Sequence, residues 1–210
     1  MKFAVIGANG KAGSRIAAEA TSRGHDVTAV VRRANESEAA HELRRDAAEL
    51  TAEDLSGFDV VVDALSFPLD AQDQHAATVT TIADALAGTD TRLIVVGGAG
   101  SLFVDEAHSK MLAETPDFPE AFLPVARGQI RQLEVLRGRE DVRWTFISPA
   151  ADFRADGERT GEYVQAGEEF TTDAEGDSAI SYADYAVGLV DEAEADGDAA
   201  HVNERISLRW

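Results

Sequence analysis

The stretch VIGANGKAG, residues 5–13, decides the fold of this 210-residue chain. It joins a short apolar run, Phe3–Ile6, to a segment with helical spacing, Ala12–Arg23. Its glycines form the pattern GxxGxxG, in which Ala8 stands where the dinucleotide fingerprint GxGxxG has its first glycine. A glycine loop between a strand and a helix brings backbone N–H groups against a pyrophosphate. A tight turn without a ligand is the alternative. The context favours binding of a dinucleotide by Gly7, Asn9, Gly10, Lys11, Ala12 and Gly13.

The rest of the chain repeats this order of apolar run, turn and helical pattern. Further strands are predicted at Val27–Val31, Val60–Asp63, Leu93–Val96, Trp144–Ile147 and Arg205–Leu208. Helices are predicted at Ala71–Ala87, Pro124–Arg137 and Tyr182–Ala195, and a mixed, helix-like stretch at 36–54. Runs rich in Val, Ile and Phe without strict alternation are typical of parallel strands covered on both faces. The sequence therefore predicts an α/β fold, a single domain over residues 1–210 with a doubly wound parallel sheet and helices on both faces.

The chain carries 39 acidic residues against 19 basic ones, which gives a formal net charge of −20, and it has no cysteine. Disulfides, iron–sulfur clusters and thiolate zinc sites are therefore excluded. The five histidines show no metal-ligand spacing, so no metal site is expected. The charge argues against partners such as nucleic acid or an anionic membrane, because both need a basic footprint. No targeting segment or membrane span is evident, and we expect a soluble, cytoplasmic protein.

The basic residues are themselves uneven, because only three are lysines and the other 16 are arginines. An acidic, lysine-poor surface is typical of proteins from very salty cytoplasm, where salt screens the self-repulsion of the charges. For a halophilic protein we expect the midpoint of thermal unfolding to rise between low and molar KCl. A midpoint that is indifferent to KCl would contradict a high-salt habitat.

Two adjacent arginines, Arg32 and Arg33, follow the predicted strand Val27–Val31. Dinucleotide folds that select NAD place an acid about 20 residues beyond the glycines, where it accepts a hydrogen bond from the ribose 2′-hydroxyl. After this strand no acid precedes Glu36. A guanidinium binds a 2′-phosphate bidentately and stacks on adenine, so the arginines favour NADP(H) over NAD(H). The alternative, that both arginines are only solvated, is less favoured in so acidic a protein.

Six motifs then occur in the order found in a known family: IGANGKAG, VVRR, FDVVVDALS, LIVVGGAGSL, WTFISPAADF and GERTGEY. Over essentially its whole length the chain resembles the atypical short-chain dehydrogenase/reductase group, in particular NAD(P)H-binding proteins and candidate NADH-flavin reductases related to biliverdin reductase B and NmrA-like proteins. The resemblance implies a Rossmann fold with NADP(H) across the carboxyl edge of the strands. It also implies hydride transfer to a flavin, quinone or similar flat acceptor, with flavin as a substrate rather than a bound cofactor.

The resemblance extends the set of predicted cofactor-binding residues. It implies that four residues lie beside the adenosine half, namely Asp46, Ala64, Leu65 and Ser66. We add Gly97 and Pro149, which stand at the ends of two later strands.

One family feature is missing from this chain. Classical members of the superfamily use a Tyr-x-x-x-Lys pair, in which the tyrosine donates a proton and the lysine lowers its pKa. None of the three tyrosines here has a lysine four residues on, and Val125 and Gln129 occupy the two positions on the helix. Flavin reduction needs less from the protein, because the cofactor carries the hydride chemistry and the acceptor takes its proton from water. A non-catalytic NADP(H)-binding sensor of the NmrA-like type agrees equally with the missing pair, whereas an isomerase or epimerase is disfavoured.

Two long segments, 98–123 and 149–178, interrupt the alternation of strands and helices. Long loops after strand ends are more often functional than accidental, so we predict that these segments form the pocket for a small-molecule acceptor. Ser101 is the candidate catalytic residue, whose hydroxyl would hydrogen-bond the nicotinamide carboxamide or the acceptor. A serine that caps a turn is equally compatible with this position.

Overall fold

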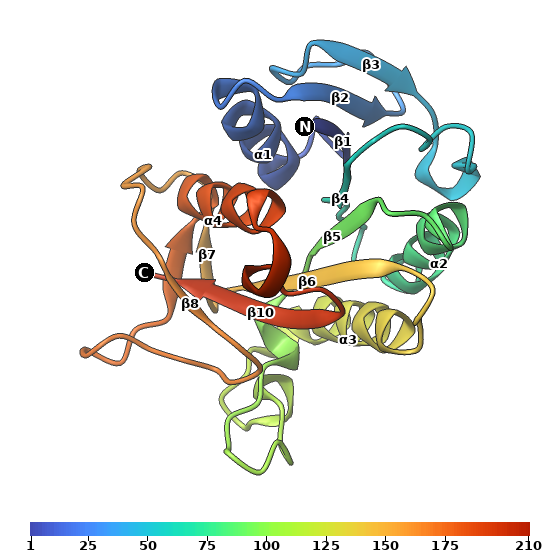
Figure 1. The fold of residues 1–210 in the computed structure, drawn as a ribbon. Helices are drawn as coiled ribbons and strands as arrows, with labels where there is room; N and C mark the ends of the chain where they lie inside the picture. Colours follow the sequence, from blue (N-terminus) through green and yellow to red (C-terminus); the bar gives the residue numbers. More distant parts are fainter.

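An eight-stranded sheet runs through the molecule in the order β3-β2-β1-β4-β5-β6-β10-β8 (Figure 1). The computed structural model describes all residues, 1–210. Every strand of this sheet is parallel to its neighbours except β8, which runs antiparallel to β10. The chain builds β1, β2 and β3 outward and then returns to the other side of β1 with β4. The predicted single-domain, doubly wound α/β fold is therefore confirmed.

The bounds of the elements are as follows. The strands are β1 (Lys2–Ile6), β2 (Asp26–Val31), β3 (His41–Arg44), β4 (Val60–Asp63), β5 (Arg92–Val96), β6 (Arg143–Pro149), β7 (Asp152–Arg154), β8 (Val164–Ala166), β9 (Ala179–Ser181) and β10 (Glu204–Arg209). The α-helices are α1 (Lys11–Ser22), α2 (Gln74–Leu86), α3 (Leu123–Arg137) and α4 (Tyr182–Glu194). Two short 3-10 helices matter below, η1 (Ala47–Glu49) and η2 (Ala99–Ser101). None of the helices combines the length and the apolar composition that crossing a membrane requires.

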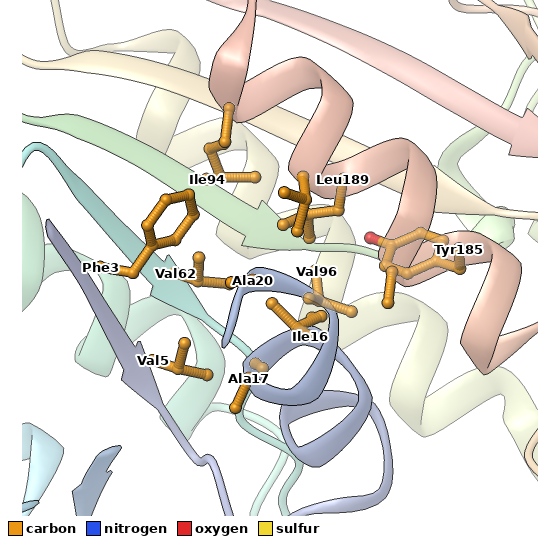
Figure 2. Close-up of a cluster of buried hydrophobic side chains, with 14 of the residues drawn as sticks. Phe3, Val5, Ile16, Ala17, Ala20, Val62, Ile94, Val96, Tyr185 and Leu189 are labelled. Atoms are coloured by element: carbon orange, nitrogen blue, oxygen red, sulfur yellow. The ribbon is translucent and has the colours of Figure 1, made fainter. Parts of the chain in front are cut away.

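Alternate residues of the parallel strands point into two separate cores. In β1, Phe3 and Val5 belong to the core that includes α1 and α4, whereas Ala4 and Ile6 belong to the core that includes α2 and α3. Figure 2 shows the first core, where Leu189 of α4 approaches the sheet beside α1. Because both faces are covered, the inner strands have no polar side, which explains the unbroken apolar runs in the sequence. Full burial of one such side chain contributes about 1.5–3 kcal/mol.

The prediction of a helix-like stretch over 36–54 is wrong. The structure has instead the edge strand β3, which pairs with β2, followed by η1. Ala39, Leu43, Ala47 and Leu50 recur at helical spacing, but Ala39 packs into the core with α1 and α4 and the other three into the core with α2 and α3, from β3, η1 and the connections beside them. β3 is exposed at three of its four positions, so it lacks the apolar run that marks the inner strands.

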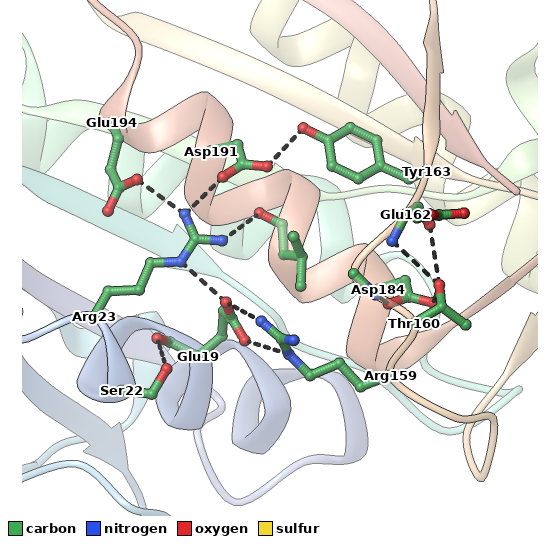
Figure 3. A network of polar contacts seen from close by, with 12 residues as sticks. Glu19, Ser22, Arg23, Arg159, Thr160, Glu162, Tyr163, Asp184, Asp191 and Glu194 are labelled. Carbon is green, nitrogen blue, oxygen red and sulfur yellow. Dashed lines mark hydrogen bonds and ion pairs between the residues drawn. The ribbon is translucent and has the colours of Figure 1, made fainter.

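Hydrogen bonds and ion pairs hold the loop between β7 and β8 against α1 and α4 (Figure 3). Arg159 donates to both carboxylate oxygens of Glu19, at 2.9 and 3.0 Å, and this contact lowers the pKa of Glu19. Tyr163 donates to Asp191 at 2.7 Å. Arg23 joins the two acids, donating to Glu19 at 3.0 Å and to Asp191 at 2.6 Å. These contacts hold residues 159–163 against the two helices.

Candidate functional site

The glycine loop, residues 7–13, is a tight turn between β1 and α1. Gly7 has a φ of +83°, which side chains rarely adopt, and its N–H donates to the carbonyl of Val30 at 3.1 Å. The N–H of Gly10 donates to the carbonyl of Gly7 at 2.8 Å and closes the turn. A Cβ atom at Gly13 would lie 2.3 Å from that same carbonyl oxygen. Only glycine at position 13 therefore lets α1 begin so close to the loop.

The N-terminus of α1 is suited to an anion. Gly10 is the N-cap residue, so no side chain accepts hydrogen bonds from the first N–H groups of the helix. The first turn holds no acidic residue, although the chain has 39 of them, and it begins with the exposed Lys11. Ala12 follows, half-buried against the core. Free N–H groups, the positive end of the helix dipole and a lysine together fit the pyrophosphate of a dinucleotide.

Asn9 ties the glycine loop to the loop that follows β2. Its side-chain Nδ2 donates to the carbonyl of Ala34 at 2.8 Å, and its Oδ1 accepts from the N–H of Glu36 at 2.8 Å. Asn9 thus holds the segment that carries Arg32 and Arg33 beside the glycine loop.

A depression of about 350 Å³ lies at the carboxyl ends of β2 and β3. Its lining residues are Arg32, Arg44, Arg45, Asp46 and Glu49. Arg32 is exposed and makes no ion pair, whereas Arg44 pairs with Glu42 at 2.7 Å and Arg45 with Asp54 at 3.0 Å. Three guanidinium groups and two carboxylates therefore line this depression, and the unpaired guanidinium of Arg32 is the group best suited to a phosphate.

Two of the predicted cofactor-binding residues, Arg33 and Asp46, differ in their relation to this depression. Arg33 is exposed but does not line the depression. Asp46 lines it and also caps η1, because its Oδ1 accepts from the N–H of Ala48 at 3.0 Å. The sequence prediction missed Arg44 and Arg45, because they were assigned to a helix rather than to the end of a strand beside β2. The signal available in the sequence is the pair of arginines before Asp46.

The remaining predicted cofactor residues follow β4, β5 and β6 at the same edge of the sheet. Ala64 is buried beside the glycine loop, where a Cβ atom at Gly7 would lie 2.9 Å from its carbonyl oxygen. Leu65 is half-buried and Ser66 exposed. Gly97 packs against the ring of Phe146, and Pro149 is the buried last residue of β6. Parallel strands thus bring these residues to one edge, as the sequence predicts for a cofactor site.

A buried carboxyl group supports the loop after β4. Asp63 Oδ1 accepts from the N–H of Leu65 at 3.2 Å, and Oδ2 accepts from Gln132 Nε2 at 3.0 Å. Burial raises the pKa of Asp63 to about 6, because the apolar surroundings disfavour its charged form. The Oε1 atom of Gln132 is buried without a hydrogen-bond partner.

We expect Asp63→Asn to stabilise the protein at pH 7 by about 2 kcal/mol. The folded-state pKa lies above that of an unfolded aspartate. The stabilising contribution of the neutral Asp63 carboxyl group is therefore fully present below about pH 4 and is lost as the pH rises through about 6. An asparagine stays neutral, and after rotation of the Gln132 amide it donates to the orphaned Oε1 atom. Urea unfolding from pH 4 to 8 measures the difference, with Asp90→Asn on the exposed surface as the control. A variant less stable than the parent at pH 7 would contradict this account.

Ser101, the candidate catalytic residue, is buried in η2. Its Oγ accepts from Arg205 Nη1 at 3.4 Å, and its carbonyl oxygen accepts from Nη2 at 3.3 Å. Arg205 also forms an ion pair with Glu168, and Phe103 exchanges backbone hydrogen bonds with residues 168 and 170. The segments 98–123 and 149–178 are therefore in contact, and Ser101 lies where they meet.

A larger, open cavity of about 920 Å³ is formed mainly by the predicted acceptor segment 149–178. Its walls are formed by the loop from Arg154 to Val164 and by Trp210. It shares no residue with the predicted cofactor site.

Comparison with known proteins agrees with this geometry. A sequence model described as NAD(P)H-binding matches residues 7–195 of the chain. The chain belongs to this NAD(P)H-binding family. The resemblance to the atypical short-chain dehydrogenase/reductase group is thereby confirmed.

Relatives in the family cover the chain from end to end. YwnB of Bacillus subtilis is 45% identical over an alignment of 214 positions, which covers 99% of this chain and 98% of YwnB. A solved structure from Streptococcus pneumoniae, described as a "putative NADH-flavin reductase", is 51% identical with a TM-score of 0.95 and covers 100% of this chain and 99% of its own. Another, from Bacteroides thetaiotaomicron and described as a "putative epimerase", is 35% identical with a TM-score of 0.86 and covers 100% and 96%.

Proposed function

We propose that this protein is an NADP(H)-dependent oxidoreductase of the flavin-reductase-like kind, which passes a hydride from NADPH to a flavin, a quinone or a similar flat acceptor. The observation that carries the cofactor preference is the depression lined by Arg32, Arg44 and Arg45 at the carboxyl ends of β2 and β3. NAD-selective folds place an acid there for the ribose 2′-hydroxyl. This depression also holds two acids, Asp46 and Glu49, but its three guanidinium groups, of which that of Arg32 makes no ion pair, favour the 2′-phosphate of NADP(H).

The roles of the residues follow from their places along the sheet edge. The N–H groups at the start of α1, with Lys11, hold the pyrophosphate, and Arg32 with Arg44 and Arg45 holds the 2′-phosphate. Bound NADPH supplies the hydride. We assign the acceptor pocket to the segments 98–123 and 149–178, which are joined where Arg205 contacts both Ser101 and Glu168.

The proposed class of acceptor follows from the missing tyrosine–lysine pair, which in classical members of the superfamily supplies a proton to the substrate. Of the three tyrosines, Tyr163 donates to Asp191 and Tyr185 donates to the carbonyl of Ile147, so these two hydroxyl groups are engaged in the fold. The third, Tyr182, has no lysine four residues on. A reduced carbonyl needs a proton from the protein at once, whereas a reduced flavin or quinone takes one from water. The name of the Streptococcus pneumoniae relative supports the same class.

The same engagement of Tyr163, Tyr185 and Ser101 supports a second candidate, an NADP(H)-binding sensor without turnover. The two are separated by mixing protein, NADPH and FMN or a quinone and following the nicotinamide absorbance. Oxidation of NADPH that depends on the protein supports the reductase. Tight binding of NADPH without oxidation across a panel of acceptors supports the sensor. Equal affinity for NADPH and NADH would overturn the assignment of NADP(H).

A further inference from the structure

Three buried side chains between α2 and α3 carry polar atoms that have no partner within the protein. The atoms are Gln72 Oε1, His75 Nδ1 and Gln132 Oε1, and each of the three residues is at most 5% exposed. Gln72 lies just before α2, His75 in its first turn and Gln132 in α3. A buried polar atom without a hydrogen bond lowers stability, so native proteins nearly always provide a partner for it. These atoms therefore point to a bound group.

The two glutamine amides cannot satisfy these atoms by turning over. The Nε2 atom of Gln72 donates to the carbonyls of Phe67 and Pro68, at 2.7 and 2.9 Å. The Nε2 atom of Gln132 donates to Asp63 at 3.0 Å. Rotation of either amide would set its oxygen against those acceptors. Both Oε1 atoms are thus fixed as acceptors, and the missing partner must donate hydrogen bonds to them.

Close packing brings the three side chains together. A Cβ atom at Gly128 would lie 3.2 Å from Gln72 Oε1 and 2.7 Å from the carbonyl oxygen of Gln72, so glycine lets the two segments approach here. Gln132 is one turn beyond Gly128, and positions four apart on a helix face are about 5–6 Å apart. Two hydrogen bonds of about 2.8 Å from one bridging atom span that distance. Gln72 and His75 both contact Phe67, His75 with its ring edge-on at 4.8 Å.

We propose that one buried water molecule lies between these side chains, donating hydrogen bonds to Gln72 Oε1 and Gln132 Oε1 and accepting one from His75 Nδ1. Water carries two donors and two acceptors, and buried waters typically make about three hydrogen bonds to polar groups that are otherwise unpaired. Burial lowers the pKa of His75 to about 4, so the imidazole is neutral at pH 7 and has one N–H to donate. An anion does not fit, because both glutamine oxygens accept. The water joins the loop that follows β4 to α3, whatever cofactor the protein binds.

A high-resolution crystal structure of the parent protein tests the site directly. We expect one isolated density peak within about 2.6–3.2 Å of all three atoms. No peak, or a peak that reaches only one of them, would overturn the proposal. Crystals soaked in rubidium chloride distinguish water from a bound cation, because only a cation site gains an anomalous signal from rubidium. Such a signal at the peak would overturn the water in favour of a monovalent cation.

Unfolding in urea tests whether Gln72 and Gln132 share one partner in solution. Gln72→Met and Gln132→Met each remove one acceptor with little change in size. We expect each to raise the equilibrium constant for unfolding about tenfold, and the double variant to raise it about 20-fold, well short of the roughly 100-fold product, because both lose the same water. Gln165→Met, exposed on β8, is the matched control, and its effect should multiply with that of Gln132→Met. Effects of Gln72→Met and Gln132→Met that also multiplied would overturn the shared water.

Discussion

Arg32→Glu should weaken binding of NADPH about 100-fold and change that of NADH by about threefold or less. The substitution removes a guanidinium that makes no ion pair within the protein and places a carboxylate in the depression beside Asp46 and Glu49. A charge-assisted hydrogen bond to phosphate is lost, and repulsion between two anions replaces it. NADH has no 2′-phosphate, and its ribose hydroxyl donates readily to a carboxylate. Titration of both cofactors against parent and variant measures the change in preference.

The control for Arg32→Glu must separate the local contact from the field of the whole protein. The parent carries a net charge of −20, so any Arg→Glu change makes the approach of an anion less favourable. Arg143→Glu makes the same change in charge at the amino ends of the strands, where β6 begins and Arg143 is exposed. We expect it to weaken NADPH and NADH alike, by about twofold or less, at 0.15 M salt. If the two variants behaved alike, the depression at Arg32 would not be the 2′-phosphate site.

The inner part of the fold was predictable because its strands are buried on both faces. β4 has the predicted bounds, Val60–Asp63, and β1, β2 and β5 each begin one residue before the predicted start. The outer strands β3 and β8 could not be predicted from a buried apolar pattern. β3 and β8 are short and mostly exposed, and hydrogen bonds to β2 and β10 make them strands. An apolar pattern marks only strands that it buries.

The residues of the candidate site also fall into two groups, those that a local pattern predicts and those that only contacts between distant segments bring together. Gly7, Gly13 and Arg32 were predictable because each stands at a fixed place relative to one strand, so a local pattern is sufficient. Arg44 enters the depression only because β3 pairs with β2. Gln129 meets Gly98 only because α3 packs on the loop after β5. Both contacts join distant segments and cannot be predicted from local spacing, although Gln129 stands at the lysine position of the missing Tyr-x-x-x-Lys pair and Arg44 in a pair of arginines before Asp46.

Gly13→Ala should damage both stability and cofactor binding. On an exposed helix this change stabilises by about 1 kcal/mol, because alanine is the better helix former. Here the new Cβ would lie 2.3 Å from the carbonyl oxygen of Gly7 and 3.1 Å from the Cα of Ala8, both backbone atoms that no rotamer change can move. The start of α1 must therefore shift away from the loop. We expect a loss of about 1–3 kcal/mol, seen as a fall of roughly 3–10 °C in the midpoint of thermal unfolding.

The same shift displaces the N–H groups at the start of α1, so we also expect binding of NADPH to fall at least about tenfold. Gly138→Ala is the matched control, because its nearest neighbour would be the carbonyl oxygen of Val135 at 3.5 Å, an ordinary contact at the end of α3. Its effect on the free energy of unfolding should stay within about 0.5 kcal/mol. A Gly13→Ala protein as stable as the parent would mean that α1 does not pack tightly on the glycine loop. A variant that lost stability but bound NADPH normally would show that Gly13 is needed for folding and that the N–H groups at the start of α1 do not bind the pyrophosphate.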